Sequence, residues 1–314
     1  MEDFCVFAGN ASLALAEEIC DCLGIQLSPL EISRFSNDNL FVQVLSNVRE
    51  RDVFVVQSFS EPVSDHIIEL FIIMDALRSA SAKRITAVIP YFSYARSDKK
   101  DAPRISITAR LMADLVKAAG ADRVLTMDLH SDSVHGFFSM PVDHLTAIPL
   151  IADHIRTTMD LSRAVAVATD AGGAKRVGKF AARLNVPMAI IDKRRMGDTE
   201  VEQGLVVGEV KDKDAIIFDD EIATGGTLKA TARTLLQAGV RRMIMGATHG
   251  VLCGQATANM KASGVDRFVV TNTVYIDESK QMDRLRIISV AVLMAEAIKR
   301  IHTGESVGAL FDSK

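Results

Sequence analysis

The segment from Ala215 to Ala238 constrains the fold more than any other part of the chain. It begins with four apolar residues, passes through the acids Asp219 and Asp220 into a run of small and hydroxyl residues, and ends in an apolar pattern with the helical period. This order is typical of a buried strand, a tight loop and a helix. Such units build parallel sheets, which bind ligands at the carboxyl ends of their strands.

The loop between this strand and helix has the composition of a phosphate-binding loop. Small residues let backbone N–H groups close around an anion at the start of a helix. The loop is neither a GK[ST] motif nor a GxGxxG motif. Carboxylates beside it can hold vicinal hydroxyls, and a pentose 5-phosphate carries both groups; the alternative is an Asp-rich turn before an ordinary helix. The loop residues are Ala223, Thr224, Gly225, Gly226 and Thr227.

The composition indicates a folded protein with room for two domains. The chain has 314 residues, of which 48% are apolar and 24% charged. Its net charge of −4 argues against a surface that coats nucleic acid, so we expect no nucleic-acid partner. The four cysteines form no CxxC pair, which favours a reducing compartment. With no signal segment and no membrane span expected, we predict a cytoplasmic protein without a membrane partner.

A strand followed by an acidic or glycine-rich turn and a helix recurs along the chain. The turns are at Asp128 to His130, at Asp170 to Gly173 and at Asp219 to Thr227, and a second half begins near Ile148. A lone histidine at a strand end, such as His130, is more often a structural hydrogen-bonding residue, and imidazole is an unusual ligand for magnesium. We expect an α/β fold that ends in a helix from Ile287 to Ile301.

Two basic segments follow predicted strands. The first, Arg96 to Arg104, has four cations that can fold over a polyphosphate, or it is a solvated basic loop. The second, Lys193 to Arg195, lies at the same edge as the phosphate loop, or it is an exposed hairpin tip. Phe35 stands in a polar segment, and its surroundings in the sequence leave it as a core residue.

Taken together, these segments resemble the ribose-phosphate diphosphokinases, also called phosphoribosyl pyrophosphate synthetases. The motifs that carry the resemblance keep the family's order over nearly the whole chain and include RFSND, TMDLH, TDAGGAKRV, AIIDKRR and DDEIATGGTL. The resemblance implies two domains like type I phosphoribosyltransferases, residues 1–147 and 148–284, each a mostly parallel sheet flanked by helices. It implies that a C-terminal helix, residues 285–314, packs back on the first domain.

The resemblance also implies a reaction and its cofactor. The family transfers the β,γ-diphosphoryl group of ATP to the C1 hydroxyl of ribose 5-phosphate, with Mg²⁺, and produces phosphoribosyl diphosphate and AMP for nucleotide biosynthesis. The resemblance further implies a homo-oligomer built from dimers, with a hexamer expected, whose subunits share each active site.

Roles for individual residues follow from the same resemblance. Lys193 and Arg195 match the two catalytic cations that stabilise the transferring charge. Asp219 and Asp220 match contacts to the ribose hydroxyls, and the loop Ala223 to Thr227 matches the 5-phosphate site. His130 and Asp170 match the positions that bind magnesium-ATP. For His130, the resemblance thus replaces the interpretation as a structural hydrogen-bonding residue. The ATP contacts are Phe35, Asn37 and Asn39, supplied to a neighbouring subunit, and Arg96, Ser97 and Arg104.

The chain departs from the family pattern at a few positions. Asn39 stands where many members have an acid, and Asn47, Ala223 and Gly225 differ from the phosphate-activated class. We therefore expect activity to persist without inorganic phosphate.

A base phosphoribosyltransferase is one competing function, but it leaves the two basic segments and the second domain unexplained. A non-catalytic regulatory homologue remains the alternative outside enzymes.

Overall fold

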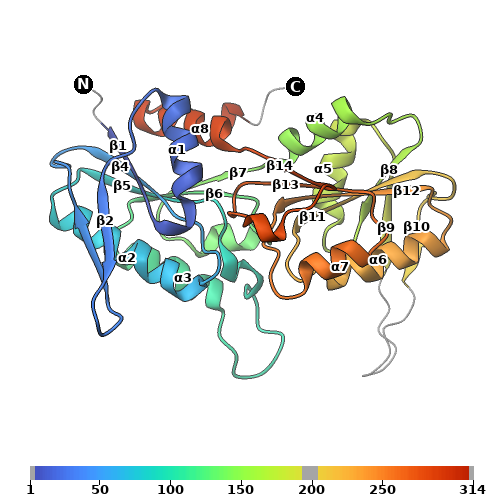
Figure 1. The fold of residues 1–314 in the computed structure, drawn as a ribbon, viewed down its shortest axis with the longest axis horizontal. Helices are drawn as coiled ribbons and strands as arrows, with labels where there is room; N and C mark the ends of the chain where they lie inside the picture. Colours follow the sequence, from blue (N-terminus) through green and yellow to red (C-terminus); the bar gives the residue numbers. More distant parts are fainter. Residues whose placement is uncertain (1–3, 193–203, 311–314) are drawn as a thin grey trace. The chain divides into compact units, whose positions relative to one another are not determined.

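The computed structural model describes residues 4–192 and 204–310 (Figure 1). The chain divides into two compact units. Unit 1 comprises the residues up to 146, residues 273–275 and the residues from 289 onward, and unit 2 comprises residues 147–272 and 276–288. Each unit is built around a mainly parallel sheet with helices on both faces, which confirms the expected α/β class.

Unit 1 contains a five-stranded parallel sheet in the order β1-β4-β5-β6-β7. Helices α1 and α8 cover one face, and α2 and α3 cover the other (Figure 1). An antiparallel hairpin, β2–β3, packs against α2. The bounds are β1 Phe4–Ala8, α1 Leu13–Leu23, β2 Leu30–Arg34, β3 Leu40–Val44, β4 Asp52–Val56, α2 Val63–Ser79, β5 Arg84–Ile89, α3 Thr108–Ala118, β6 Arg123–Met127, β7 Val142–Leu145 and α8 Ala291–Thr303.

Unit 2 contains a seven-stranded sheet in the order β10-β9-β8-β11-β12-β13-β14, in which only β10 runs antiparallel to its neighbour among the described strands. Helices α4 and α5 cover one face, and α6 and α7 cover the other (Figure 1). The bounds are α4 Ile148–Thr158, β8 Ala164–Ala168, α5 Ala174–Leu184, β9 Met188–Asp192, β10 Leu205–Val207, β11 Asp214–Glu221, α6 Gly226–Gln237, β12 Arg242–His249, α7 Ala256–Ala262, β13 Arg267–Thr271 and β14 Leu285–Ile288.

The strand order of unit 2 reverses at β8. After β8 the chain adds β9 and β10 on one side, and it then returns to place β11 on the other side. Two neighbouring parallel strands whose connections leave in opposite directions form a crevice at their carboxyl ends, where open α/β sheets bind ligands. The sheet of unit 1 has no such reversal among its described strands, because they follow one another in chain order. The topology therefore directs attention to the ends of β8 and β11.

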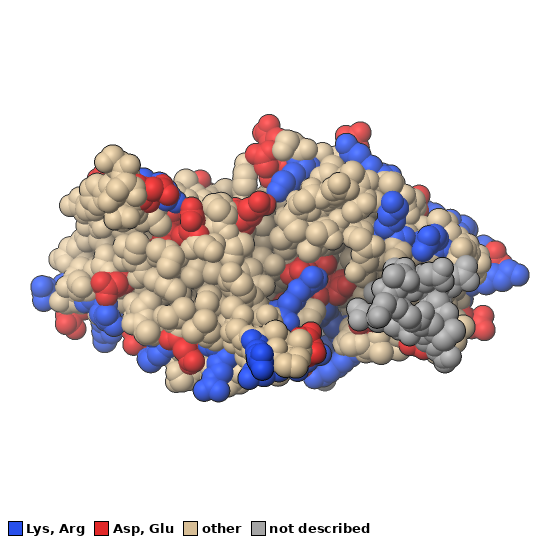
Figure 2. Space-filling model, turned by 90° about the horizontal axis from the view of Figure 1, so that it is seen from below, with Lys and Arg blue, Asp and Glu red and all other residues tan. Residues whose placement is uncertain are grey.

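Short 3₁₀ helices complete the described chain. Their bounds are η1 Asn10–Ser12, η2 Ser93–Arg96, η3 Asp132–Phe137, η4 Glu278–Lys280 and η5 Gly308–Leu310. Within 4–192 and 204–310, no helix is both long enough and apolar enough to cross a membrane. Acidic and basic side chains lie interspersed over the face drawn in Figure 2.

The structure corrects the start of the last helix. The sequence predicts a helix from Ile287, but residues 285–288 form strand β14, and α8 begins at Ala291. The β-branched Ile287 and Ile288 pair in parallel with β13, and Asn272 N–H donates to the Ile288 carbonyl at 3.0 Å. Completing the edge of the unit 2 sheet thus outweighs the helical apolar pattern of these residues.

A buried carboxylate connects α8 to the sheet of unit 1. Asp52, at the start of β4, is 7% exposed and accepts hydrogen bonds from both Nε (2.8 Å) and Nη2 of Arg84. His302 Nδ1 on α8 lies 3.0 Å from the same carboxylate, and Arg84 also donates to the Ile301 carbonyl at 2.9 Å. One charged cluster therefore joins β4, β5 and the C-terminal helix.

Removing this carboxylate charge is expected to lower the free energy of unfolding. We predict that Asp52→Asn costs about 1–3 kcal/mol, because it leaves the partly buried Arg84 guanidinium without its charged acceptor. Urea denaturation measures the loss. The control is Asp75→Asn, whose side chain is 60% exposed in its pair with Arg78 and should change stability by less than about 0.5 kcal/mol. Equal effects of the two substitutions would contradict the assignment.

Candidate functional site

Two adjacent carboxylates stand at the end of β11, beside the end of β8. Asp220 is 2% exposed, and its backbone N–H donates to Asp219 Oδ1 at 2.9 Å. The other Asp219 oxygen, Oδ2, accepts from the hydroxyl of Thr169, the residue that follows β8, at 3.0 Å. A hydrogen bond thus crosses the crevice at the strand reversal.

An arginine from α5 pairs with both acids. Arg176 Nη1 lies 2.9 Å from Asp220 Oδ1 and 3.3 Å from Asp219 Oδ1. The sequence prediction gave Arg176 no role, although it lies in the TDAGGAKRV motif. The available signal was physical: two adjacent acids on a buried strand need a neighbouring cation, and a helix that starts beside that strand can supply one.

The surroundings of Asp219 alter its acidity. Burial raises the pKa of Asp219, and the hydrogen bond and charge of Asp220 raise it further. Arg176 lowers it, and the combined result is a pKa raised from 3.8 to about 7. A carboxyl group that titrates near neutral pH is typical of a functional site.

The loop after β11 has the backbone geometry of an anion site. Gly225, the N-cap of α6, has φ 73°, in the left-handed region that glycine adopts without steric cost. Neighbouring segments hold the loop: Asn259 Nδ2 of α7 donates to the Thr224 carbonyl at 2.9 Å, and Cys253 N–H donates to the Ala223 carbonyl at 3.0 Å. The loop therefore presents the first N–H groups of α6, a 12-residue helix, at the carboxyl edge of the sheet.

The two residues predicted to bind magnesium belong to different units, and each is described in its own. Asp170 in unit 2 is exposed just after β8, and its Oδ1 accepts from Gly173 N–H at 3.0 Å. His130 in unit 1 is exposed after β6. Within the described ranges, no three metal-ligating side chains gather. Proteins usually hold Mg²⁺ through one or two carboxylates plus substrate phosphates, and the exposed Asp170 carboxylate fits that donor set.

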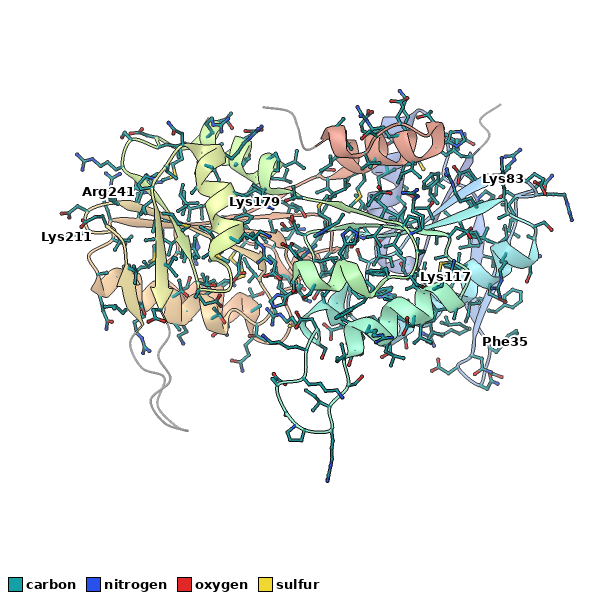
Figure 3. The ribbon with its side chains drawn as sticks, turned by 180° about the vertical axis from the view of Figure 1, so that it is seen from behind. Phe35, Lys83, Lys117, Lys179, Lys211 and Arg241 are labelled. Atoms are coloured by element: carbon teal, nitrogen blue, oxygen red, sulfur yellow. The ribbon has the colours of Figure 1, made fainter. Side chains whose placement is uncertain are left out.

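The hairpin of unit 1 corrects the core assignment of Phe35. This side chain is 57% exposed beside the turn that joins β2 to β3, as Figure 3 shows, and its ring meets Phe41 edge-on at 5.5 Å. Phe35 N–H donates to the Asn39 carbonyl at 2.9 Å, and Asn37 Oδ1 accepts from Asn39 N–H at 3.3 Å. The hairpin therefore brings Phe35, Asn37 and Asn39 together.

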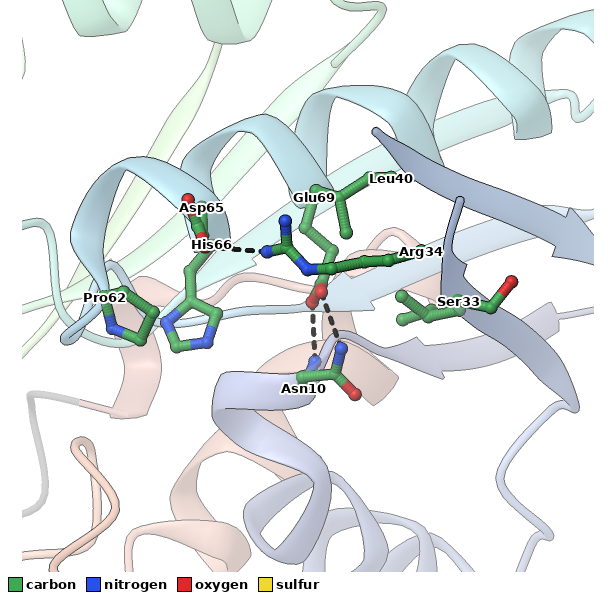
Figure 4. Close-up of a pocket in the computed structure, with 9 residues that line it drawn as sticks. Asn10, Ser33, Arg34, Leu40, Pro62, Asp65, His66 and Glu69 are labelled. Carbon is green, nitrogen blue, oxygen red and sulfur yellow. Dashed lines mark hydrogen bonds and ion pairs between the residues drawn. The ribbon is translucent and has the colours of Figure 1, made fainter. Parts of the chain in front are cut away.

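A small polar pocket lies where this hairpin meets α2 (Figure 4). Its volume is about 140 Å³. Arg34 Nη1 donates to Asp38 in the turn at 2.9 Å, and its Nη2 donates to Asp65 on α2 at 2.7 Å. At the base of the pocket, the buried Glu69 accepts from the backbone and side chain of Asn10 at 2.7 and 2.6 Å. The Arg34–Asp65 contact thus ties the hairpin to α2, and the Glu69–Asn10 contacts tie α2 to η1.

The remaining candidates lie in two segments. In unit 1, Arg96 ends η2 and is exposed, Ser97 follows it, and Arg104 is exposed with φ 64°. Lys193 and Arg195 lie outside the described residues. The structure thus places the two acids, Thr169, Arg176 and the phosphate loop at one crevice of unit 2.

The raised pKa of Asp219 predicts a pH-dependent stability. In the native state the carboxyl keeps its proton up to about pH 7, whereas an unfolded aspartate loses it near 3.8, so the native state binds more protons between these values and stability falls as pH rises through them. Asp219→Asn should remove this trend. Melting temperatures between pH 5 and pH 8 are the measurement, with the exposed Asp283→Asn as control. Parallel curves for wild type and Asp219→Asn would contradict the prediction.

The left-handed glycine of the loop gives a stability prediction. Gly225→Ala should lower the free energy of unfolding by about 1–2 kcal/mol, because alanine is strained at this φ and its Cβ would lie 3.1 Å from Asn259 Cβ. Gly226 is the matched control, since a Cβ there meets nothing nearer than 3.7 Å. Guanidinium denaturation should show no loss in the free energy of unfolding for Gly226→Ala. Equal losses in the two variants would contradict the assignment of the effect to backbone strain at Gly225.

Family comparisons cover most of the chain. Residues 4–120 match the N-terminal domain of ribose phosphate pyrophosphokinase, and residues 203–312 match the phosphoribosyl synthetase-associated domain. A relative from Streptomyces coelicolor is 50% identical over 315 residues, covering 100% of this chain and 99% of that protein. The ribose-phosphate pyrophosphokinase of Deinococcus radiodurans is 49% identical, covering 98% of this chain and 97% of that protein.

A solved structure supports the same relationship. The crystal structure of phosphoribosylpyrophosphate synthetase from Mycobacterium smegmatis is 38% identical, with a TM-score of 0.92. The match covers 96% of this chain and 100% of that one. Because sequence and fold both match along nearly the whole length, the chain belongs to the ribose-phosphate pyrophosphokinase family.

Proposed function

We propose that this protein transfers the β,γ-diphosphoryl group of ATP to the C1 hydroxyl of ribose 5-phosphate. The products are phosphoribosyl diphosphate, a precursor in nucleotide biosynthesis, and AMP. The observation that carries the proposal is the pairing, at one crevice of unit 2, of two adjacent carboxylates with an anion-binding loop. Membership of the ribose-phosphate pyrophosphokinase family identifies ribose 5-phosphate as the sugar phosphate and diphosphoryl transfer as the reaction that we propose.

The crevice suits both ends of ribose 5-phosphate. The 5-phosphate accepts hydrogen bonds from backbone N–H groups in the loop Ala223 to Thr227, where the α6 dipole favours an anion. The ribose hydroxyls donate to the carboxylates of Asp219 and Asp220, and the backbone N–H of Asp220 donates to Asp219 Oδ1 at 2.9 Å. Held at both ends, the sugar presents its C1 hydroxyl in a fixed place, which lowers the entropic cost of the transfer.

The chemical step exchanges one P–O bond for another. The C1 oxygen bonds to the β phosphorus of ATP, the bond from that phosphorus to the α,β-bridging oxygen breaks, and that oxygen leaves as part of AMP. The hydroxyl proton is released from the C1 oxygen to solvent. Negative charge builds up on the transferring group and on the leaving AMP. We assign Lys193 and Arg195 to this charge, since fixed cations beside a developing charge contribute most to rate.

Magnesium fits this site as a partner of the nucleotide phosphates. Asp170 supplies the hard oxygen ligand that Mg²⁺ prefers, and His130 is proposed as the second position. When bound, the ion would neutralise phosphate charge during the transfer.

ATP recognition is assigned to unit 1 segments. Arg96, Ser97 and Arg104 are proposed to contact the phosphates, and Phe35, Asn37 and Asn39 to contact the adenine of a neighbouring subunit. The exposed Phe35 ring supports the second assignment, because an aromatic face open to solvent can stack on a base. The active protein would then be a homo-oligomer built from dimers, such as a hexamer. Cys5, Cys20, Cys22 and Cys253, all in the described part of the chain, form no disulfide, which agrees with the proposed cytoplasmic setting.

The reaction itself can be tested directly. Purified protein with Mg²⁺, ATP and ribose 5-phosphate in phosphate-free buffer should produce AMP and phosphoribosyl diphosphate in equal amounts. Release of ADP would indicate transfer of a single phosphoryl group and would overturn the proposed reaction. If neither product appears with or without added phosphate, a non-catalytic regulatory role is favoured.

Substitution of Lys193 tests the catalytic assignment. Lys193→Ala should lower kcat by about 10²-fold or more, because a cation that contacts the transferring charge acts mainly in the transition state. The control is Lys179→Ala, which removes an exposed lysine on α5 and should leave kcat unchanged. A near-normal kcat in Lys193→Ala would refute the role.

A further inference from the structure

Arg176 is built into the acid pair more tightly than a surface ion pair would be. Its side chain is 19% exposed, and the side chains of Asp219 and Asp220 are 23% and 3% exposed. One nitrogen, Nη1, reaches both carboxylates, at 3.3 and 2.9 Å. Two adjacent carboxylates with little access to water repel each other, and the partly buried guanidinium of Arg176 offsets part of that repulsion.

The contacts also fix how the Asp219 carboxylate is oriented. Its Oδ1 accepts from Asp220 N–H and from Arg176, and its Oδ2 accepts from the Thr169 hydroxyl. The donors come from three places in unit 2, namely β11, α5 and the residue after β8. A carboxylate with directional donors on both oxygens has one orientation, and the remaining lone pairs point in fixed directions.

We propose that Arg176 is a positioning residue that holds Asp219 and Asp220 as a matched pair of acceptors for two neighbouring sugar hydroxyls. This inference rests on the proposed function and adds a specificity determinant to it. A site built to accept two hydroxyl donors rejects an analogue that lacks one, because a buried acceptor is then left unpaired. Arg176 thereby contributes to the choice of ribose 5-phosphate over 2-deoxyribose 5-phosphate.

A second arginine on the same helix offers a matched control. Arg183 of α5 pairs with Asp153 of α4 at 3.0 Å, and its side chain is 29% exposed. Arg183 stands in the last turn of α5, whereas Arg176 stands in its first turn. Replacing Arg183 thus removes an ion pair of α5 from the same unit without altering the proposed hydroxyl contacts.

The experiment compares Arg176→Met, Arg176→Lys and Arg183→Met in the full-length protein. Arg176→Met should raise the KM for ribose 5-phosphate about tenfold or more, while the KM for ATP changes less than about twofold. The ratio of kcat/KM for ribose 5-phosphate over 2-deoxyribose 5-phosphate should fall by a similar factor. Arg176→Lys keeps the charge and should recover part of both losses. Arg183→Met should match wild type in both quantities.

Several outcomes would overturn the inference. The first is an unchanged ratio of kcat/KM for ribose 5-phosphate over 2-deoxyribose 5-phosphate, here called the sugar ratio, in Arg176→Met. The second is an equal rise in the KM for ribose 5-phosphate and the KM for ATP in that variant. The third is a fall of the sugar ratio in Arg183→Met as large as that in Arg176→Met. If circular dichroism shows that Arg176→Met does not fold, the sugar ratio of Arg176→Lys decides, and a wild-type ratio then refutes the role. If the wild-type protein makes no AMP, the proposed reaction fails; calorimetric titration with the two sugar phosphates still tests Arg176, and equal affinities of wild type and Arg176→Met refute it.

Discussion

The ion cluster at the end of β11 is the interaction on which the candidate site depends. Two adjacent carboxylates in a mostly buried position are unfavourable unless their charges are compensated, and Arg176 Nη1 reaches both, at 2.9 and 3.3 Å. The compensation is incomplete, since the pKa of Asp219 is still raised to about 7. Two adjacent, mostly buried carboxylates do not stabilise the protein. Their presence is best explained by a ligand that uses the carboxylate oxygens of Asp219 and Asp220 as hydrogen-bond acceptors.

The topology of unit 2 is what allows this cluster to form. The strand order reverses between β8 and β11, which opens a crevice at their carboxyl ends. Thr169, directly after β8, and both acids, at the end of β11, lie there and are joined by the Thr169–Asp219 hydrogen bond. The helices that follow these two strands pack on opposite faces of the sheet, so α5 supplies Arg176 and α6 supplies the N–H groups of the phosphate loop. Backbone geometry completes the arrangement, because Gly225 takes a left-handed conformation that lets the loop turn into α6.

Much of the fold could be predicted from the sequence, because apolar runs such as β8 and helical periods such as α5 are local signals. The position of the loop between β11 and α6 was also predictable, since its small residues follow a strand directly. Residues 285–288 were not, because their strand depends on pairing with β13, which no local pattern records. The contacts of Arg176 and the exposure of Phe35 were missed for the same reason. Those contacts depend on acids 43 and 44 residues away in the chain, and that exposure depends on hairpin packing.

The central claim is that the crevice of unit 2 holds a pentose phosphate by both ends. A crystal structure of the protein soaked with ribose 5-phosphate tests it most directly. The account predicts the phosphate on the backbone N–H groups of residues 224–227 and two ribose hydroxyls within hydrogen-bond distance of Asp219 and Asp220. A sugar phosphate bound elsewhere, or bound at the loop with its hydroxyls turned away from both acids, would contradict it.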